Sequence, residues 1–209
     1  ETINAFGAAA QRSKEAGFDA VQLHAAHGYL LTQFLSPHTN RRTDEWGGNP
    51  EKRMRFVTDV NNSVREAVGD DYPVLIKLSV EEGLENGITL DEASNIAMRL
   101  SQVGIDAIEI SGGTIVDTVF MMSRGDIPID MITRNADPAA KEQMEGFFYS
   151  IKDMVKYEDA YWRKHAEKIK EVIGDVPLIL VGGMKYPQTM AKILEENKAD
   201  LISLCRSLI

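Results

Sequence analysis

Amphipathic helical segments alternate along this chain with short apolar segments that are rich in β-branched residues. The helical pattern covers residues 2–16, 50–68, 90–103, about 157–173 and about 187–197. The apolar segments that follow these helices are residues 20–24, 74–79, 107–111, 177–181 and 201–206. Segments this continuously apolar are typical of parallel strands that are covered on both faces, so the pattern predicts an α/β protein with five parallel strands.

Capping signals mark the ends of several predicted helices. Asn49 and Pro50 place a cap before a proline at the first helical position, and Thr89 with Glu92 forms a capping-box pattern. Glycines such as Gly104 follow the helical pattern at its far ends. These signals predict where helices begin and where they give way to strands.

Two arrangements of five parallel strands fit this pattern, a doubly wound sheet and part of an eight-stranded barrel, and periodicity alone does not separate them. In both arrangements, ligands gather at the carboxyl ends of the strands. The residues at those ends are His24, Ser79, Ser111, Gly182 with Gly183, and Arg206. We therefore expect a ligand site at this edge of the sheet.

Residues 112–156 are the exception to the short connections found elsewhere. They mix methionines and aromatic residues with polar residues and glycines. Connections of this length are usually functional excursions or lids, although an insertion packed on the outside of the protein has the same composition. The sequence otherwise predicts a single domain over residues 1–209.

Composition narrows the function classes. The chain has 209 residues, of which 44% are hydrophobic, and a net charge of -9. The acidic balance and the lack of a basic cluster argue against nucleic acid and anionic membranes as partners and favour a small-molecule substrate. The single cysteine, Cys205, cannot form an internal disulfide, which favours a reducing compartment such as the cytoplasm. No apolar run reaches the roughly 20 residues that cross a bilayer.

His24, His27 and Tyr29 lie together where the first predicted strand ends. An imidazole N–H could hold a carbonyl oxygen and stabilise negative charge on it, and the Tyr29 phenol could act as a general acid. The alternatives are structural: imidazoles bonded only to nearby backbone, and a tyrosine packed in the core. A zinc site would need a third histidine or carboxylate at suitable spacing, which the pattern lacks.

At the other end of the predicted sheet, Gly182, Gly183 and Arg206 form a possible phosphate site, because glycine amides and an arginine fork bind anions. A plain tight turn explains the glycine pair equally well.

The second predicted strand carries Lys77, whose ammonium group needs a partner among apolar neighbours. That partner could be a bound anionic or electron-rich ring, or a carboxylate such as Glu109 or Asp106. At the end of the last predicted strand, we expect Cys205 to be a buried apolar residue.

Several motifs together resemble the old yellow enzyme family of NADH:flavin oxidoreductases, which are FMN-binding (β/α)8 barrels. The central motif is HAAHGYLLTQFLSPHTNRRTDEWGGNPEKRMRF at residues 24–56, followed by VLIKLS, AIEISGG, LILVGG and ADLISLCRSLI. The resemblance spans most of the chain and implies strands four to eight of a TIM barrel, with the first three strands absent. It therefore implies a fragment of a longer oxidoreductase, whose iron–sulfur cysteines, if any, would lie beyond Ile209.

The resemblance also implies a role for each site residue. His24 and His27 would hold the carbonyl of an activated alkene such as an enone or enoate, while Tyr29 would protonate its α carbon. Hydride would come from FMN that NADH or NADPH has reduced, as in an ene-reductase. Lys77 would lie near the flavin ring, where the family most often has an arginine. The FMN phosphate would be cradled by Gly182, Gly183, the Cys205 backbone and Arg206.

Two other functions fit the same residues. One is a phosphate-ligand TIM-barrel enzyme without redox chemistry, such as an aldolase or isomerase. The other is an inactive half-barrel that depends on a complementing chain or a second copy of itself, because open sheet edges expose unpaired backbone.

Overall fold

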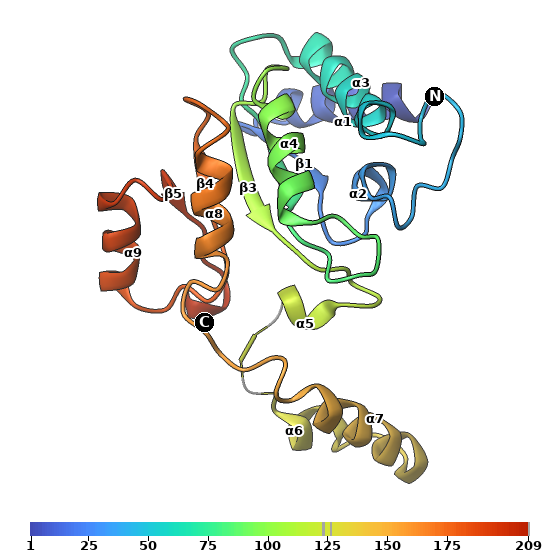
Figure 1. Ribbon diagram of the computed structural model, residues 1–209, viewed down its shortest axis with the longest axis vertical. Helices are drawn as coiled ribbons and strands as arrows, with labels where there is room; N and C mark the ends of the chain where they lie inside the picture. The colour runs from blue at the N-terminus through green and yellow to red at the C-terminus, as the bar shows by residue number, and fades with distance from the viewer. Residues whose placement is uncertain (123, 126, 209) are drawn as a thin grey trace.

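The computed structural model describes residues 1–122, 124–125 and 127–208. Within these residues, five parallel strands form one sheet in the order β1-β2-β3-β4-β5 (Figure 1). The strands are β1 (Val21–Ala25), β2 (Val74–Ser79), β3 (Ala107–Ser111), β4 (Leu178–Leu180) and β5 (Leu201–Ile202). Each strand lies beside the next one in the chain, as in a barrel, whereas a doubly wound sheet reverses its order at a switch point. The α/β prediction is confirmed, and the barrel is the better of its two forms.

Helices connect the strands and cover one face of the sheet, where α1 packs on α3 and α4 on α8. The helices that belong to this layer are α1 (Thr2–Glu15), α2 (Leu30–Leu35), α3 (Pro50–Val68), α4 (Leu90–Leu100), α8 (Arg163–Lys170) and α9 (Pro187–Glu195). A short 3₁₀ helix, η1 (Arg206–Leu208), follows β5. Among the described residues, no helix combines the length and apolar character needed to cross a membrane.

The predicted caps form at both helix starts. Asn49 accepts a hydrogen bond from the Lys52 backbone N–H, and Pro50 occupies the first position of α3. Thr89 accepts from the Glu92 backbone N–H at the start of α4. The Glu92 carboxylate, however, pairs with Arg53 on α3, so only half of the capping box forms and the other half joins two helices.

Alternate strand residues build the core between the sheet and its helices. Ile76 and Ile108 are neighbours in the register of β2 and β3, and Leu178 of β4 is next to Ile108. All three are completely buried. Because side chains alternate between faces along a strand, the positions between them point to the opposite face. We call this opposite face the inner face, and it carries Gln22, His24, Lys77 and Glu109.

Two predicted elements are shorter than expected. The helix predicted at about 157–173 is regular only over Arg163–Lys170. The residues before it are irregular because Ala160 has a left-handed φ of 52° and the Tyr161 hydroxyl donates to the Met122 carbonyl. The strand predicted at 201–206 ends at Ile202, after which the chain bends into η1. Tertiary contacts therefore override the local pattern in both places.

The prediction that Cys205 is buried is wrong. The side chain is exposed. The physical reason is the early end of β5: Cys205 lies in the bend that follows the strand and not in the sheet. Its thiol therefore lies beyond the carboxyl end of β5 and is not part of the core.

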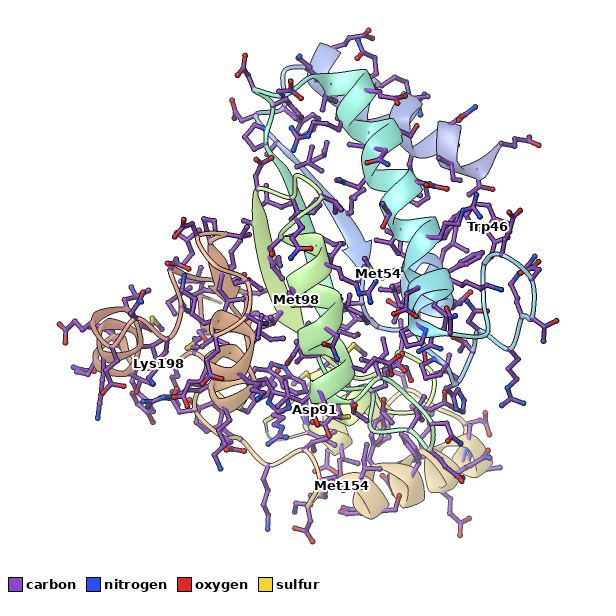
Figure 2. All side chains as sticks on the ribbon, turned by 45° about the horizontal axis from the view of Figure 1, so that its top comes forward. Trp46, Met54, Asp91, Met98, Met154 and Lys198 are labelled. Atoms are coloured by element: carbon purple, nitrogen blue, oxygen red, sulfur yellow. The ribbon has the colours of Figure 1, made fainter. Side chains whose placement is uncertain are left out.

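The long connection between β3 and β4 contains helices α5 (Val119–Met122), α6 (Ile129–Thr133) and α7 (Pro138–Ile151). Figure 1 shows α6 and α7 projecting away from the sheet, and Figure 2 labels Met154 in the same projecting region. Every residue of α7 is at least partly exposed, including Phe147 at 54% and Tyr149 at 59%. The long connection is thus largely helical, and its function as an excursion or lid stays a prediction.

Candidate active site

The turn between β1 and α2 holds two consecutive residues in the left-handed region. His27 has a φ of 64° and Gly28 a φ of 79°. A histidine rarely adopts this conformation, and it persists here because neighbouring strands hold it. The His27 backbone N–H donates to Ser79 Oγ over 3.1 Å, and the Ile115 N–H donates to the His27 carbonyl over 3.1 Å. The turn is therefore fixed by the ends of β2 and β3.

The three predicted catalytic side chains gather at this turn. The rings of His24 and His27 meet edge to face with centroids 5.1 Å apart, and the rings of His24 and Tyr29 lie 4.9 Å apart. Tyr29 is 46% exposed, so it is not a core residue. His27 Nε2 lies 2.7 Å from Ser111 Oγ, a side-chain partner on β3 that fixes the orientation of the ring. The structure thus brings together two imidazoles and a phenol.

The surroundings of both imidazoles favour their uncharged forms. Burial is the largest cause that lowers the pKa of His27, to about 4, and the nearby His24 and Lys77 lower it further while Glu109 opposes them. Burial and then Lys77 also lower the pKa of His24 below its ordinary value, again against Glu109. A neutral imidazole carries one N–H, so each ring can donate one hydrogen bond to a substrate oxygen.

The stability of the folded protein is expected to fall as the pH drops from 6.5 towards 4. The pKa of His27 is about 4 in the fold and 6.5 when unfolded, so in this window the unfolded chain binds the proton and the folded chain does not. The stability that the uncharged His27 contributes is complete above pH 6.5 and lost below about pH 4. Urea unfolding at a series of pH values in this window measures it.

The matched variant for this measurement is His27→Gln, which keeps a polar side chain and removes the titrating ring. Its stability should depend less steeply on pH than that of the unchanged protein. An identical slope in both proteins would show that His27 does not carry the effect.

Lys77 has a carboxylate partner on the inner face. Its Nζ lies 2.7 Å from Glu109 Oε1, and Gln22 Nε2 donates to Glu109 Oε2 over 2.8 Å. Of the two acidic partners that the sequence allowed, Glu109 is therefore the right one. Asp106 instead pairs with Arg65 over 2.6 Å on the outside of the sheet.

The glycine pair after β4 forms a tight turn, with φ angles of 113° at Gly182 and 67° at Gly183. A Cβ on Gly182 would lie 2.7 Å from Trp162 Cδ1, and one on Gly183 would lie 2.3 Å from the Glu158 carbonyl oxygen. Packing and conformation alone therefore require glycine at both positions. Their role in binding phosphate stays a prediction, and the predicted contact from Arg206 falls on a side chain outside the part of the chain that the structure describes.

One cavity joins the histidine turn to the glycine turn. Its volume is about 180 Å³. Its lining residues include His27, Lys77 and Ser111 towards β1–β3, and Gly182 and Cys205 towards β4 and β5. All five lie on the inner face or at the carboxyl ends of the strands, where barrels bind their ligands. The two halves of the predicted site thus share one mouth.

Two residues that shape the site were missed in the sequence. Gln22 holds Glu109, and its signal was a polar residue two positions before His24 in an apolar strand. Trp162 is 2% exposed and lies against the positions where Gly112 and Gly182 would carry a Cβ. It therefore packs behind the ends of both β3 and β4, although nothing in its local sequence indicates this.

The chain matches the NADH:flavin oxidoreductase / NADH oxidase family over residues 1–209. It belongs to this family. The predicted resemblance to the NADH:flavin oxidoreductases is thereby confirmed.

Two related proteins align with the whole of this chain. The NADH oxidase of Thermoanaerobacter brockii is 36% identical over 210 residues, which are 100% of this chain and 27% of that protein. The NADPH dehydrogenase of Bacillus velezensis is 35% identical over 210 residues, which are 100% of this chain and 51% of that protein. This chain therefore spans only a quarter to a half of the length of these relatives.

A solved structure shows the same fold. The complex of 2-naphthoyl-CoA reductase with 2-naphthoyl-CoA superimposes with a TM-score of 0.77 and 28% identity. The alignment covers 99% of this chain and 27% of that one. The five strands in sequential order thus correspond to part of a larger TIM-barrel enzyme.

Proposed function

We propose that the protein containing this chain is an FMN-dependent oxidoreductase that passes hydride from NADH or NADPH to an activated alkene. One observation carries the proposal: His27 lines the same cavity as Lys77 and Gly182, and the ring of His24, with Tyr29 beside it, lies against the His27 ring. This mouth combines donors for a substrate oxygen with groups suited to an anionic cofactor.

The described residues fit FMN chemically. Lys77 presents an ammonium group on the inner face, where an electron-rich ring could lie, and the turn at Gly182 and Gly183 and the backbone at Cys205 border the other end of the cavity, where a phosphate could bind. When bound, FMN takes up hydride from the reduced nicotinamide and supplies it to the substrate. Residues 1–209 would then form part of one flavin-binding barrel domain, with the helical excursion at about 112–156.

The histidines and the tyrosine divide the work on the substrate. His24 and His27 each donate one N–H to the carbonyl oxygen and stabilise the negative charge that grows on it when hydride reaches the β carbon. Tyr29 donates its phenolic proton to the α carbon as a general acid. Ser111 keeps the His27 ring in place throughout.

The substrate class follows from this division of roles. A carbon–carbon double bond accepts hydride readily only when a conjugated carbonyl can take up the charge, so enones and enoate-like compounds fit the site. The bound molecule in the similar 2-naphthoyl-CoA reductase has a carbonyl attached to an unsaturated ring, which supports a conjugated carbonyl as the recognised group. The location in the cytoplasm and any self-association stay predictions.

The proposal predicts that the complete protein, purified without added cofactor, releases FMN on denaturation. Mass spectrometry of the released small molecules identifies it, and anaerobic addition of NADH or NADPH should bleach the visible flavin absorption. If the denatured protein released a phosphate compound without redox chemistry and no flavin, the proposal would be contradicted. That result would favour an aldolase- or isomerase-like barrel. Flavin binding without bleaching would contradict the nicotinamide step alone.

A further inference from the structure

A row of charged and polar side chains crosses the inner face at one level. The register places His24 beside Lys77 and Lys77 beside Glu109. The next position in the row, Ile179 on β4, carries no charge. The titratable groups that face one another here are therefore the His24 imidazole of β1, the ammonium of β2 and the carboxylate of β3, with the His27 imidazole in the turn after β1.

Glu109 is the most buried member of this row, with 6% exposure. A buried carboxylate is costly unless it is paired and hydrogen-bonded, and Glu109 meets both conditions. One oxygen contacts Lys77 Nζ at 2.7 Å, and the other accepts from Gln22 Nε2 at 2.8 Å. Because each oxygen has its own partner on a different strand, the carboxylate fixes where the Lys77 ammonium lies.

We propose that Glu109 is a positioning residue that holds the Lys77 ammonium on the inner face and offsets its charge towards the histidine pair and the flavin ring. The inference rests on the proposed function for its flavin part. Glu109 touches neither substrate nor cofactor in this role, since it acts through Lys77.

The sign of the effect follows from charge. The reduced flavin is more negative than the oxidised one, so an uncompensated ammonium beside it raises the midpoint potential. The same ammonium disfavours protonation of His24 and His27, while Glu109 favours it. Loss of the Glu109 charge should therefore shift the midpoint potential and the histidine pKa. Loss of the Lys77 charge should shift each of these two quantities in the opposite direction.

The experiment uses four forms of the complete protein: unchanged, Glu109→Gln, Lys77→Met and the double variant. Glutamine has nearly the same shape as glutamate and removes its charge, while one of the two acceptor oxygens becomes an NH₂ donor. We expect Glu109→Gln to raise the flavin midpoint potential. We expect the same change to lower the pKa of His24, by on the order of one pKa unit or less. Lys77→Met should do the reverse, and the double variant, in which the pair is again neutral, should return towards the unchanged protein.

Two controls isolate the effect. Glu51→Gln removes an equivalent carboxylate from an exposed ion pair with Arg99 on the outer helices and should shift neither quantity. In the NMR measurement, His38 and His165 serve as internal references, because their hydrogen bonds are with the Glu85 carbonyl and the Glu81 carboxylate and not with the Lys77–Glu109 pair. If Glu109→Gln leaves the protein poorly folded, Lys77→Met reports on the same pair from the other side.

The outcomes separate this inference from the proposed function. If flavin binds but Glu109→Gln and Lys77→Met leave both the potential and the His24 titration unchanged, the role of Glu109 is wrong while the flavoprotein proposal stands. If no flavin binds, the proposed function fails, and the His24 titration still decides whether Glu109 offsets Lys77. Shifts of equal sign in the two single variants would also overturn the inference.

Discussion

Replacing Tyr29 with phenylalanine is expected to slow reduction of an activated alkene by roughly 10²–10⁴-fold, the usual contribution of a positioned general acid. The change removes one hydroxyl and keeps the ring that lies 4.9 Å from the ring of His24. Reduction of the flavin by NADH or NADPH needs no proton from this phenol and should continue at nearly the original rate. Stopped-flow measurement of the two half-reactions separates the steps.

Tyr72→Phe is the matched control for this variant. Tyr72 is buried near the other end of the strands, and its hydroxyl donates to the Phe18 carbonyl over 2.7 Å. Its loss should weaken the fold slightly and leave both half-reactions alone. An equal slowing of both half-reactions by Tyr29→Phe would show that the residue shapes the site and does not donate the proton.

Replacing Trp162 with alanine is expected to lower the free energy of unfolding by about 3–5 kcal/mol, the range for removing a large buried aromatic side chain. The indole is 2% exposed and meets the ring of His165 edge to face at 4.7 Å. It also fills the space that a Cβ on Gly112 or Gly182 would occupy. Its removal leaves a cavity behind the ends of β3 and β4, which urea unfolding would measure.

Trp46→Ala provides the comparison for this measurement. Trp46 is only partly buried beside α3, where Figure 2 labels it, and it stacks under the Arg55 guanidinium at 5.0 Å. Trp46→Ala should lower the free energy of unfolding by clearly less than Trp162→Ala does. Equal losses would mean that the packing behind β3 and β4 is not specially important.

Elements with strong local signals could be predicted from the sequence. The strand Val74–Ser79 and the start of α3 at Pro50 lie where the pattern placed them, because β-branched runs and caps act over a few residues. The proximity of His24, His27 and Tyr29 was also predictable, since they are close in the chain and leave the same strand end. Local chemistry therefore located the first half of the site.

The rest of the site depends on contacts between distant segments. Whether Lys77 pairs with Glu109 or with Asp106 is decided by the strand register and the side on which each residue points, and no pattern within either strand contains that register. The exposure of Cys205 likewise depends on where β5 stops pairing with β4. Sequence reasoning named these residues and could not choose among their neighbours.

The pairing of β3 with β4 joins positions that are about twice as far apart in the chain as those joined by β2 and β3, as the pairs Ile108–Leu178 and Ile76–Ile108 show. Doubling a flexible loop raises its closure entropy by only about 0.6 kcal/mol. The helices of residues 112–156 therefore add little to the entropic cost of closing the sheet. Exchanging this segment between relatives should accordingly leave the pairing of the five strands unchanged.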